Sequence, residues 1–108
     1  MVKDAVVDLI TSAADAQRIV REIAVDTDNI FLTKHACERM EERGFDLKDL
    51  FDVLRRGFVD DMPEFNGEKN EWKCKVVKQL NYGRDAGVIT AILRVGKLVI
   101  LTMEWEDL

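Results

Sequence analysis

The chain has 108 residues, of which 47% are hydrophobic and 34% charged, with one Pro and six Gly. This is the length and composition of one globular domain with its own core, so we expect neither a disordered chain nor a second domain. No uncharged run approaches the roughly 18 residues of a membrane helix, and residues 1–4 lack the basic start of a secretory signal, so we expect a cytoplasmic protein with no membrane partner.

The net charge is −5, but the charges are unevenly distributed along the chain. Residues 72–97 carry six basic side chains against Asp85 alone, which gives this segment +5 and leaves −10 for the rest. If the strands of that segment lie together, the acidic protein has a cationic surface. We therefore expect RNA or an acidic protein segment as its ligand.

The N-terminal third predicts an amphipathic helix. Ser12 is suited to cap it and Asp15 lies in its first turn, and the apolar residues then recur at helical spacing. These apolar residues are Ala16, Ile19, Val20, Ile23 and Ala24. The apolar residues within 2–10 either extend this helix backward or form a separate turn. Residues 26–29 end the helix in a turn.

Residues 30–32 predict a short strand that leads to Thr33, the cap of a second helix. This helix holds the only histidine of the chain. At positions i, i+4 and i+8, the side chains of His35, Arg39 and Arg43 form a single cationic stripe. Another side of the helix is available for burial and carries Ala36, Cys37 and Met40.

Gly44 ends the second helix, and Asp46 caps a third one that stops at Gly57. Apolar residues again recur at helical spacing: Leu47, Leu50, Phe51 and Leu54. We expect these two helices to form a corner on a shared core. Residues 60–70 hold many acids, one Pro and one Gly, and predict a loop.

From residue 72 the hydrophobic period changes from that of a helix to that of a strand. Residues 72–76 alternate between apolar and basic side chains, so Lys73 and Lys75 form the basic second face of a half-buried strand. Residues 81–87 predict a turn.

Residues 88–95 and 98–105 are β-rich, and Gly96-Lys97 between them predicts a tight hairpin with Gly at the first turn position. Both faces of these central strands are apolar for most of their length. We therefore expect helices on one face, and either a cover or a ligand groove on the other. The order of elements predicts an α+β fold in which N-terminal helices pack on a three- to four-stranded antiparallel sheet. It forms a single domain over residues 30–108, with residues 1–29 as an N-terminal helical extension.

Four stretches of the sequence, in this order, resemble a prokaryotic family known as domain of unknown function 4258. They are residues 35–44, 72–76, 83–88 and 101–105, within a resemblance that covers about residues 30–107. The family is similar in layout to the RelE and BrnT type of toxin, small proteins that cleave RNA without a metal. This resemblance implies a RelE/BrnT-like fold, metal-independent RNA cleavage and an antitoxin-like protein partner.

Metal-free RNA cleavage needs a base, an acid and cations around the phosphate. His35 has a suitable intrinsic pKa for either proton transfer, and arginines and lysines supply the cations. The candidate catalytic residues are His35, Arg39, Arg84 and Glu104. The candidate ligand-binding residues are Arg43, Lys73 and Lys75.

Each candidate also has a structural interpretation. His35 at a helix start could hydrogen-bond a backbone group or a carboxylate, and Arg39 and Arg43 could form ion pairs with nearby acids. Glu104, on an apolar strand, could pair with Arg84 or Arg39 instead of acting as a general base. The lysines could be the solvated face of an edge strand.

The sequence predicts no metal site and no cofactor. On a helix His35 and Cys37 point about 200° apart, so they cannot bind one zinc ion. Cys37 and Cys74 are widely spaced, and we expect both thiols to be buried.

Three functional hypotheses follow. The first is a small cytoplasmic RNase-toxin-like protein. The second is a non-catalytic binding module that uses a basic sheet face for RNA or an acidic protein partner. The third is an assembly protein whose sheet edge pairs with another chain, including a second copy of itself in a homo-oligomer.

Overall fold

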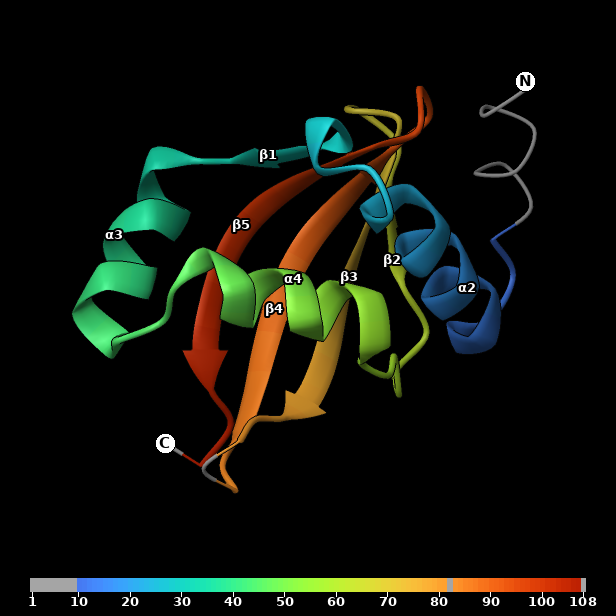
Figure 1. Ribbon diagram of the computed structural model, residues 1–108. Coiled ribbons are helices and arrows are strands. Elements are labelled where there is room, and N and C mark those ends of the chain that lie inside the picture. Colours follow the sequence, from blue (N-terminus) through green and yellow to red (C-terminus); the bar gives the residue numbers. More distant parts are fainter. Residues whose placement is uncertain (1–9, 82, 108) are drawn as a thin grey trace.

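The computed structural model of the protein describes residues 10–81 and 83–107. Within these residues a five-stranded sheet has the order β1-β5-β4-β3-β2, and three α-helices pack beside it (Figure 1). The helices are α2 (Ala13–Ala24), α3 (Lys34–Arg43) and α4 (Leu47–Arg56), with the 3-10 turn η1 (Thr27–Asn29) after α2. The strands are β1 (Ile30–Leu32), β2 (Glu64–Asn66), β3 (Glu71–Gln79), β4 (Asp85–Leu93) and β5 (Lys97–Trp105).

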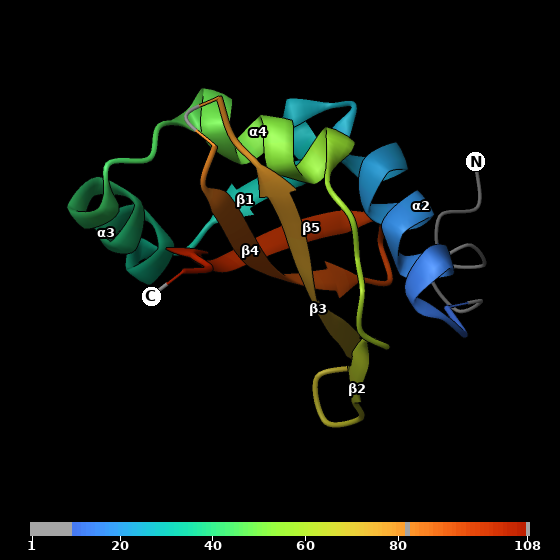
Figure 2. The same ribbon diagram turned by 90° about the horizontal axis from the view of Figure 1, so that it is seen from below.

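The described part of the chain has two layers. Figure 2 shows α2 and α4 across one face of the sheet and α3 beside β5 at the edge of the same layer. The other face carries no helix of the described chain. The predicted α+β class is therefore confirmed. The possible backward extension of the first helix over residues 2–9 lies outside the described residues.

The helix ends follow from local chemistry, as the sequence predicts. The side chains of Ser12, Thr33 and Asp46 each accept a backbone N–H from the first turn of the helix that follows. Asp46 and Asp49 form a reciprocal capping box. Gly44 ends α3 with φ +77°, a left-handed conformation that glycine adopts without strain.

The sheet is larger than predicted and is mixed rather than antiparallel. β1 pairs with β5 in parallel, and the other three pairings are antiparallel. The fifth strand, β2, lies within residues 60–70, which the sequence predicts as a loop. This strand has only three residues, all exposed, so it has no buried face to give it a hydrophobic period.

The hairpin between β4 and β5 also differs from the prediction. Leu93 pairs with Lys97, so three residues, 94–96, form the turn instead of two. Gly96 is the last of them, with φ +82°, instead of the first. A three-residue hairpin commonly ends in a left-handed residue, which explains why glycine stands there.

The core lies between the helix layer and the sheet. Leu50, Leu54 and Met40 are buried at 4% exposure or less, as expected from their spacing. Leu47 is 52% exposed, contrary to that spacing, because it lies in the first turn of α4 and not over the sheet. Val53 takes its place, since positions 50, 53 and 54 share one side of the helix.

Candidate functional site

His35 lies at the exposed N-terminal end of α3. Within the described residues it makes no hydrogen bond or ion pair, and Thr33 caps the helix instead. The neighbouring Cys37 is also exposed, contrary to the prediction. Ala36 and Met40 lie on one line along the helix, and Cys37 is rotated about 100° from Ala36, away from the core.

The two arginines of α3 do not form a free cationic stripe with His35. Arg39 Nη1 donates to Glu42 Oε1 at 2.6 Å on the same helix. Arg43 turns toward the sheet and donates from Nη1 to the carbonyl oxygen of Met103 at 2.7 Å. The Trp105 indole N–H in turn donates to the carbonyl of Arg43 at 3.0 Å. Arg43 therefore fastens α3 to β5.

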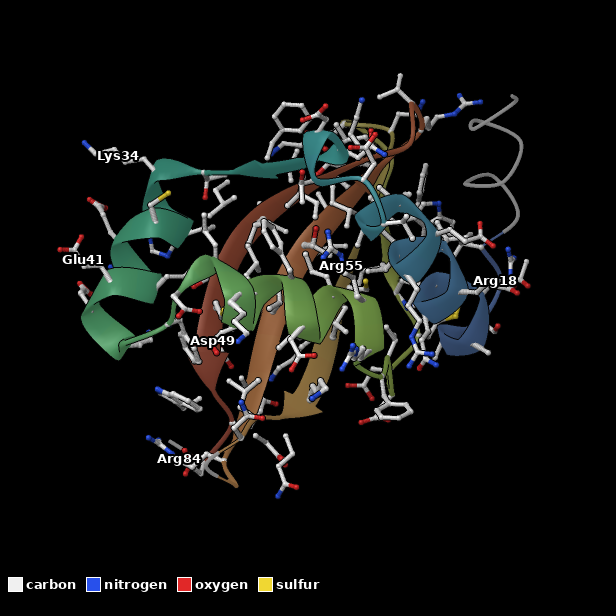
Figure 3. All side chains as sticks on the ribbon, viewed as in Figure 1. Arg18, Lys34, Glu41, Asp49, Arg55 and Arg84 are labelled. Carbon is white, nitrogen blue, oxygen red and sulfur yellow. The ribbon has the colours of Figure 1, made fainter. Side chains whose placement is uncertain are left out.

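Arg84 lies at the end of the molecule where the β3–β4 turn and the end of β5 meet (Figure 3). Its Nε and Nη2 donate to the two carboxylate oxygens of Asp107 at 3.0 and 2.8 Å. Its guanidinium carbon lies 4.2 Å from the centre of the Trp105 ring, within cation–π distance. The hydrogen bond from Arg84 lowers the pKa of Asp107.

The structure does not bring His35 and Arg84 together. Arg84 stacks on Trp105, which binds the carbonyl of Arg43 at the C-terminal end of α3, whereas His35 begins that helix. Eight residues separate the two ends, which is about 12 Å along the axis at 1.5 Å per residue. These two side chains therefore do not share one phosphate-sized site.

Glu104 lies on the opposite side of the sheet from α3. Its neighbours Met103 and Trp105 are buried under the helices, so the alternation of β5 turns Glu104 to the other face. There its Oε2 lies 3.3 Å from Nζ of Lys75. Glu104 is thus paired, as the structural interpretation predicts, but with Lys75 rather than with Arg84 or Arg39.

We call the sheet face that carries no helix the open face. The outward positions in the middle of its two central strands, β4 and β5, are apolar, as expected from the sequence. They are Ile89, Ala91 and Leu93 on β4, and Val99 and Leu101 on β5. At the β1 edge Phe31, paired with Val99, is 50% exposed. Polar residues occupy the ends of these strands on the same face, with Asp85, Thr102 and Glu104 toward one end and Lys97 at the other, so the apolar side chains form a central patch with a polar rim.

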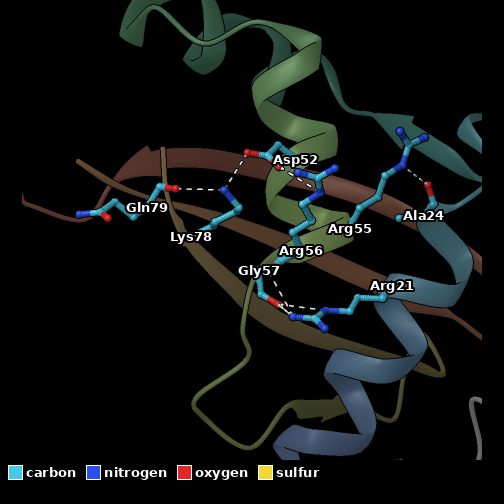
Figure 4. A network of polar contacts seen from close by, with 8 residues as sticks. All are labelled: Arg21, Ala24, Asp52, Arg55, Arg56, Gly57, Lys78 and Gln79. Atoms are coloured by element: carbon cyan, nitrogen blue, oxygen red, sulfur yellow. Dashed lines mark hydrogen bonds and ion pairs between the residues drawn. The ribbon is translucent and has the colours of Figure 1, made fainter. Parts of the chain in front are cut away.

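The open face is not basic, which corrects the prediction from the charge of residues 72–97. Lys73 lies 3.7 Å from Glu64, and Lys75 pairs with both Glu104 and Glu106. Lys78 is on the helix side, 2.9 Å from Asp52 of α4 (Figure 4). The charged residues described on the open face are five acids and three bases, a net charge of −2: Glu64, Glu71, Asp85, Glu104, Glu106, Lys73, Lys75 and Lys97.

Lys75 reaches its partners across Gly87, which has no side chain. A Cβ at Gly87 would lie 2.6 Å from Oε2 of Glu106 and 2.8 Å from Cε of Lys75. Partial burial lowers the pKa of Lys75, but the hydrogen bonds and charges of Glu106 and Glu104 outweigh it, so the pKa is raised overall. The three charged side chains form a compensated cluster at one end of the open face.

Two hollows adjoin the open face, and Glu64 and Lys73 line both of them. The smaller hollow, of about 410 Å³, lies along the edge of β3 and reaches Ile89. The larger, of about 930 Å³, lies between the β2–β3 hairpin and Leu101 of β5. The hairpin projects away from the helix layer (Figure 2), so it forms a wall beside the apolar strands.

A third hollow, of about 650 Å³, lies on the helix side between α4 and the β3–β4 turn. Most of its polar side chains already have partners. Asp46 and Asp49 form the capping box, Asp52 pairs with Lys78, and Arg55 donates to the carbonyl of Ala24. It therefore offers a ligand few unused polar groups.

In the described part of the chain, no three His, Cys, Asp or Glu side chains are placed to hold a metal ion. None of its helices is long and apolar enough to cross a membrane.

These features define a small α+β domain with one sheet face covered by helices and one open. A family model described as "Domain of unknown function (DUF4258)" matches residues 32–104, and the chain belongs to this family. No curated protein and no solved structure gives a significant match. The more distant likeness to RelE and BrnT toxins therefore remains a prediction. Helix α2 lies outside the matched residues.

Sequence reasoning missed the β2–β3 hairpin, which walls the larger hollow. Its cross-strand pairs were the signal that could have found it. Phe65 faces Trp72 with ring centres 4.9 Å apart, and Glu64 faces Lys73. An aromatic pair beside an opposite-charge pair, on both sides of a Gly-containing turn, is typical of a hairpin.

Proposed function

We propose that this protein is a non-catalytic binding module whose open face receives a protein partner. One observation carries the proposal. The helix layer covers a single face of the sheet, yet the middle of the opposite face carries the apolar side chains of Ile89, Val99 and Leu101. Contiguous apolar surface beside a polar rim is typical of an interaction surface.

The extent of the face is compatible with a specific interface. Strands β3, β4 and β5 each have nine residues, or about 30 Å at 3.4 Å per residue. Neighbouring strands are about 4.8 Å apart, and β1 and β2 add three residues each at the two edges. The resulting area of about 540 Å² is about two thirds of the roughly 800 Å² per partner of a standard protein interface.

Charge favours a protein over RNA as the ligand. RNA binding rests on cations that are free to replace counterions along the phosphate backbone. On the open face Lys73 and Lys75 are held by carboxylates, and acids outnumber bases. An apolar centre with charges of both signs around it matches the usual anatomy of a protein interface.

Metal-independent RNA cleavage is a second candidate function, and the observation that favours it concerns α3. His35 is exposed, makes no polar contact within the described residues and stands one helical turn from Arg39. An imidazole beside a guanidinium could act on a phosphate ester.

Three tagged proteins test the first proposal in the native host: the wild type, Ile89→Lys on the open face and Leu47→Lys on α4. Both variants replace an apolar residue by lysine, and Leu47 is an exposed residue on the helix side. We expect a partner retained by the wild type and by Leu47→Lys but reduced about tenfold by Ile89→Lys, measured by quantitative mass spectrometry. Thermal unfolding of each variant verifies folding.

Two results contradict the proposal. Retention of the same proteins by all three chains means that the open face binds none of them. Retention of RNA that is released steadily by added salt assigns the face to nucleic acid instead.

A further inference from the structure

The larger hollow on the open face is comparable in volume to a short helical segment. It holds about 930 Å³ between the β2–β3 hairpin and Leu101. An α-helix about 10 Å wide occupies roughly 420 Å³ per 5.4 Å turn. The volume of the hollow is thus close to that of about two turns of helix.

The backbone of the sheet favours a helix over an extended strand. Every residue of β4 is aligned with β3 on one side, and eight of the nine are also aligned with β5 on the other. The centre of the open face therefore offers an incoming chain no free ladder of N–H and C=O groups. A segment that lies there must satisfy its own backbone groups, and a helix does this internally.

The charges around the hollow indicate the sign of the charge that a partner carries. Its lining includes the carboxylates of Glu64, Glu68 and Glu71 and the ammonium groups of Lys69 and Lys73. Lys73 pairs with Glu64, whereas Glu68 and Glu71 have no ion-pair partner within the described residues. The face has a net charge of −2 and the chain −5, so a basic partner is attracted both locally and at a distance.

We propose that the occupant of the open face is an amphipathic α-helix of a partner protein, with an apolar stripe flanked by Lys or Arg. This inference rests on the proposed function and specifies its partner. The apolar stripe packs on Ile89, Val99 and Leu101, and the basic flank faces Glu68 and Glu71 on the hairpin. This mode is the helix-in-groove type of recognition, in which anchors recur at i, i+3, i+4 and i+7.

The experiment is site-specific photo-crosslinking in the native host. A p-benzoylphenylalanine replaces Leu101 in the hollow, and in a matched control it replaces Leu47 on α4. The captured peptide is sequenced by mass spectrometry. We expect position 101, and not position 47, to capture a basic segment with apolar residues at helical spacing.

Two other kinds of result contradict the inference. A captured peptide that is acidic, that lacks helical spacing, or that comes from a second copy of this chain overturns the helix inference but leaves the open face as a binding surface. Capture of nothing beyond the Leu47 control overturns both the inference and the proposed function.

A charge exchange on purified proteins tests the basic flank. The mapped segment is synthesised as a fluorescent peptide and titrated with wild-type protein, with Glu68→Lys/Glu71→Lys, and with Glu41→Lys on α3 as control. We expect the double variant to weaken binding about tenfold and the control to change it less than about twofold. Equal affinity for all three proteins overturns the assignment of the basic flank to the hairpin.

Discussion

Arg21 and Arg55 each bind the C-terminal end of the other's helix (Figure 4). Arg55, in the last turn of α4, donates from Nε to the carbonyl of Ala24 at 2.8 Å. Arg21, in the last turn of α2, donates from Nη2 to the carbonyl of Gly57 at 2.7 Å. Carbonyls at a helix C-terminus lack partners inside the helix and carry partial negative charge, so a guanidinium stabilises them. These two hydrogen bonds connect α2 to α4. Helix α2 precedes the residues matched by the family model, and α4 lies within them.

The first prediction follows from this exchange. Arg55→Met keeps most of the side-chain stem but removes the charge and the hydrogen bond to Ala24. We expect it to lower the free energy of unfolding by about 1 to 2 kcal/mol, measured by urea denaturation. Arg18→Met is the control, because within the described residues Arg18 pairs only with side chains on its own helix, and it should cost less than about 0.5 kcal/mol. Equal costs would show that the bond to Ala24 contributes nothing.

A second prediction contrasts two glycines in narrow spaces. A Cβ at Gly57 meets the backbone oxygen of Val53 at 2.5 Å, whereas a Cβ at Gly87 meets only the ends of two flexible side chains. We expect Gly57→Ala to cost about 2 to 3 kcal/mol and Gly87→Ala less than about 1 kcal/mol in urea unfolding. The reverse order would mean that the helix end near Gly57 adjusts more easily than the Lys75 cluster.

The two thiols provide a third prediction. Burial raises the pKa of Cys74 to about 12, while Cys37 is exposed. Because the thiolate is the reactive species, Cys74 should not react with a thiol reagent such as DTNB at pH 8 in the folded protein. We expect one reactive thiol per chain in the native state and two in urea. The Cys37→Ser variant should show none until it is unfolded, and a rapid native reaction of that variant would contradict the burial of Cys74.

A fourth prediction concerns pH. The pKa of Lys75 is raised in the folded protein, so its stabilising effect is complete below its unfolded pKa and is lost as the pH rises through the folded value. We expect wild type to exceed Lys75→Gln in urea midpoint at pH 7 and at pH 9, and the difference to shrink above about pH 10.5. Lys73→Gln, which removes only a 3.7 Å contact with the exposed Glu64, should differ little from wild type at any of these pH values. A Lys75→Gln deficit that persists unchanged at alkaline pH would assign the effect to packing instead of charge.

The helices could be predicted from the sequence because their determinants are local. Ser12, Thr33 and Asp46 lie within a few residues of the groups they cap, and Leu50 and Leu54 repeat one turn apart. The strand β3 could be predicted for the same reason, since its alternation of apolar and basic residues is a property of neighbouring residues. Strands β4 and β5 could be predicted from their β-rich runs on either side of Gly96.

The partners of the charged side chains could not be predicted, because they depend on pairing between distant segments. β1 lies beside β5 through a parallel register that joins Ile30 to Leu98. The pairing of Lys75 with Glu104 needs the alignment of three strands, including the shift between Ile89 and Thr90. The side chain of Arg43 donates to a carbonyl sixty residues away in the sequence. Helical spacing alone therefore predicts its position wrongly, as part of a cationic stripe on α3.

The last prediction separates the two candidate functions, and it concerns His35. Because this side chain is exposed and makes no polar contact within the described residues, His35→Gln should change the free energy of unfolding by less than about 0.5 kcal/mol. Under the binding-module proposal, wild-type protein incubated with total RNA in EDTA leaves the RNA intact. The same preparation serves for the unfolding and cleavage measurements.

Cleavage by the wild type would replace that proposal with the second candidate, and the variants would then identify the chemistry. If His35 transfers a proton, His35→Gln should lower cleavage about 100-fold or more and leave RNA binding nearly unchanged. Arg84→Ala is the comparison variant. Because Arg84 contacts Asp107 and Trp105, we expect its substitution to lower the free energy of unfolding. A His35→Gln protein that folds normally and cleaves RNA as fast as wild type would exclude His35 from catalysis.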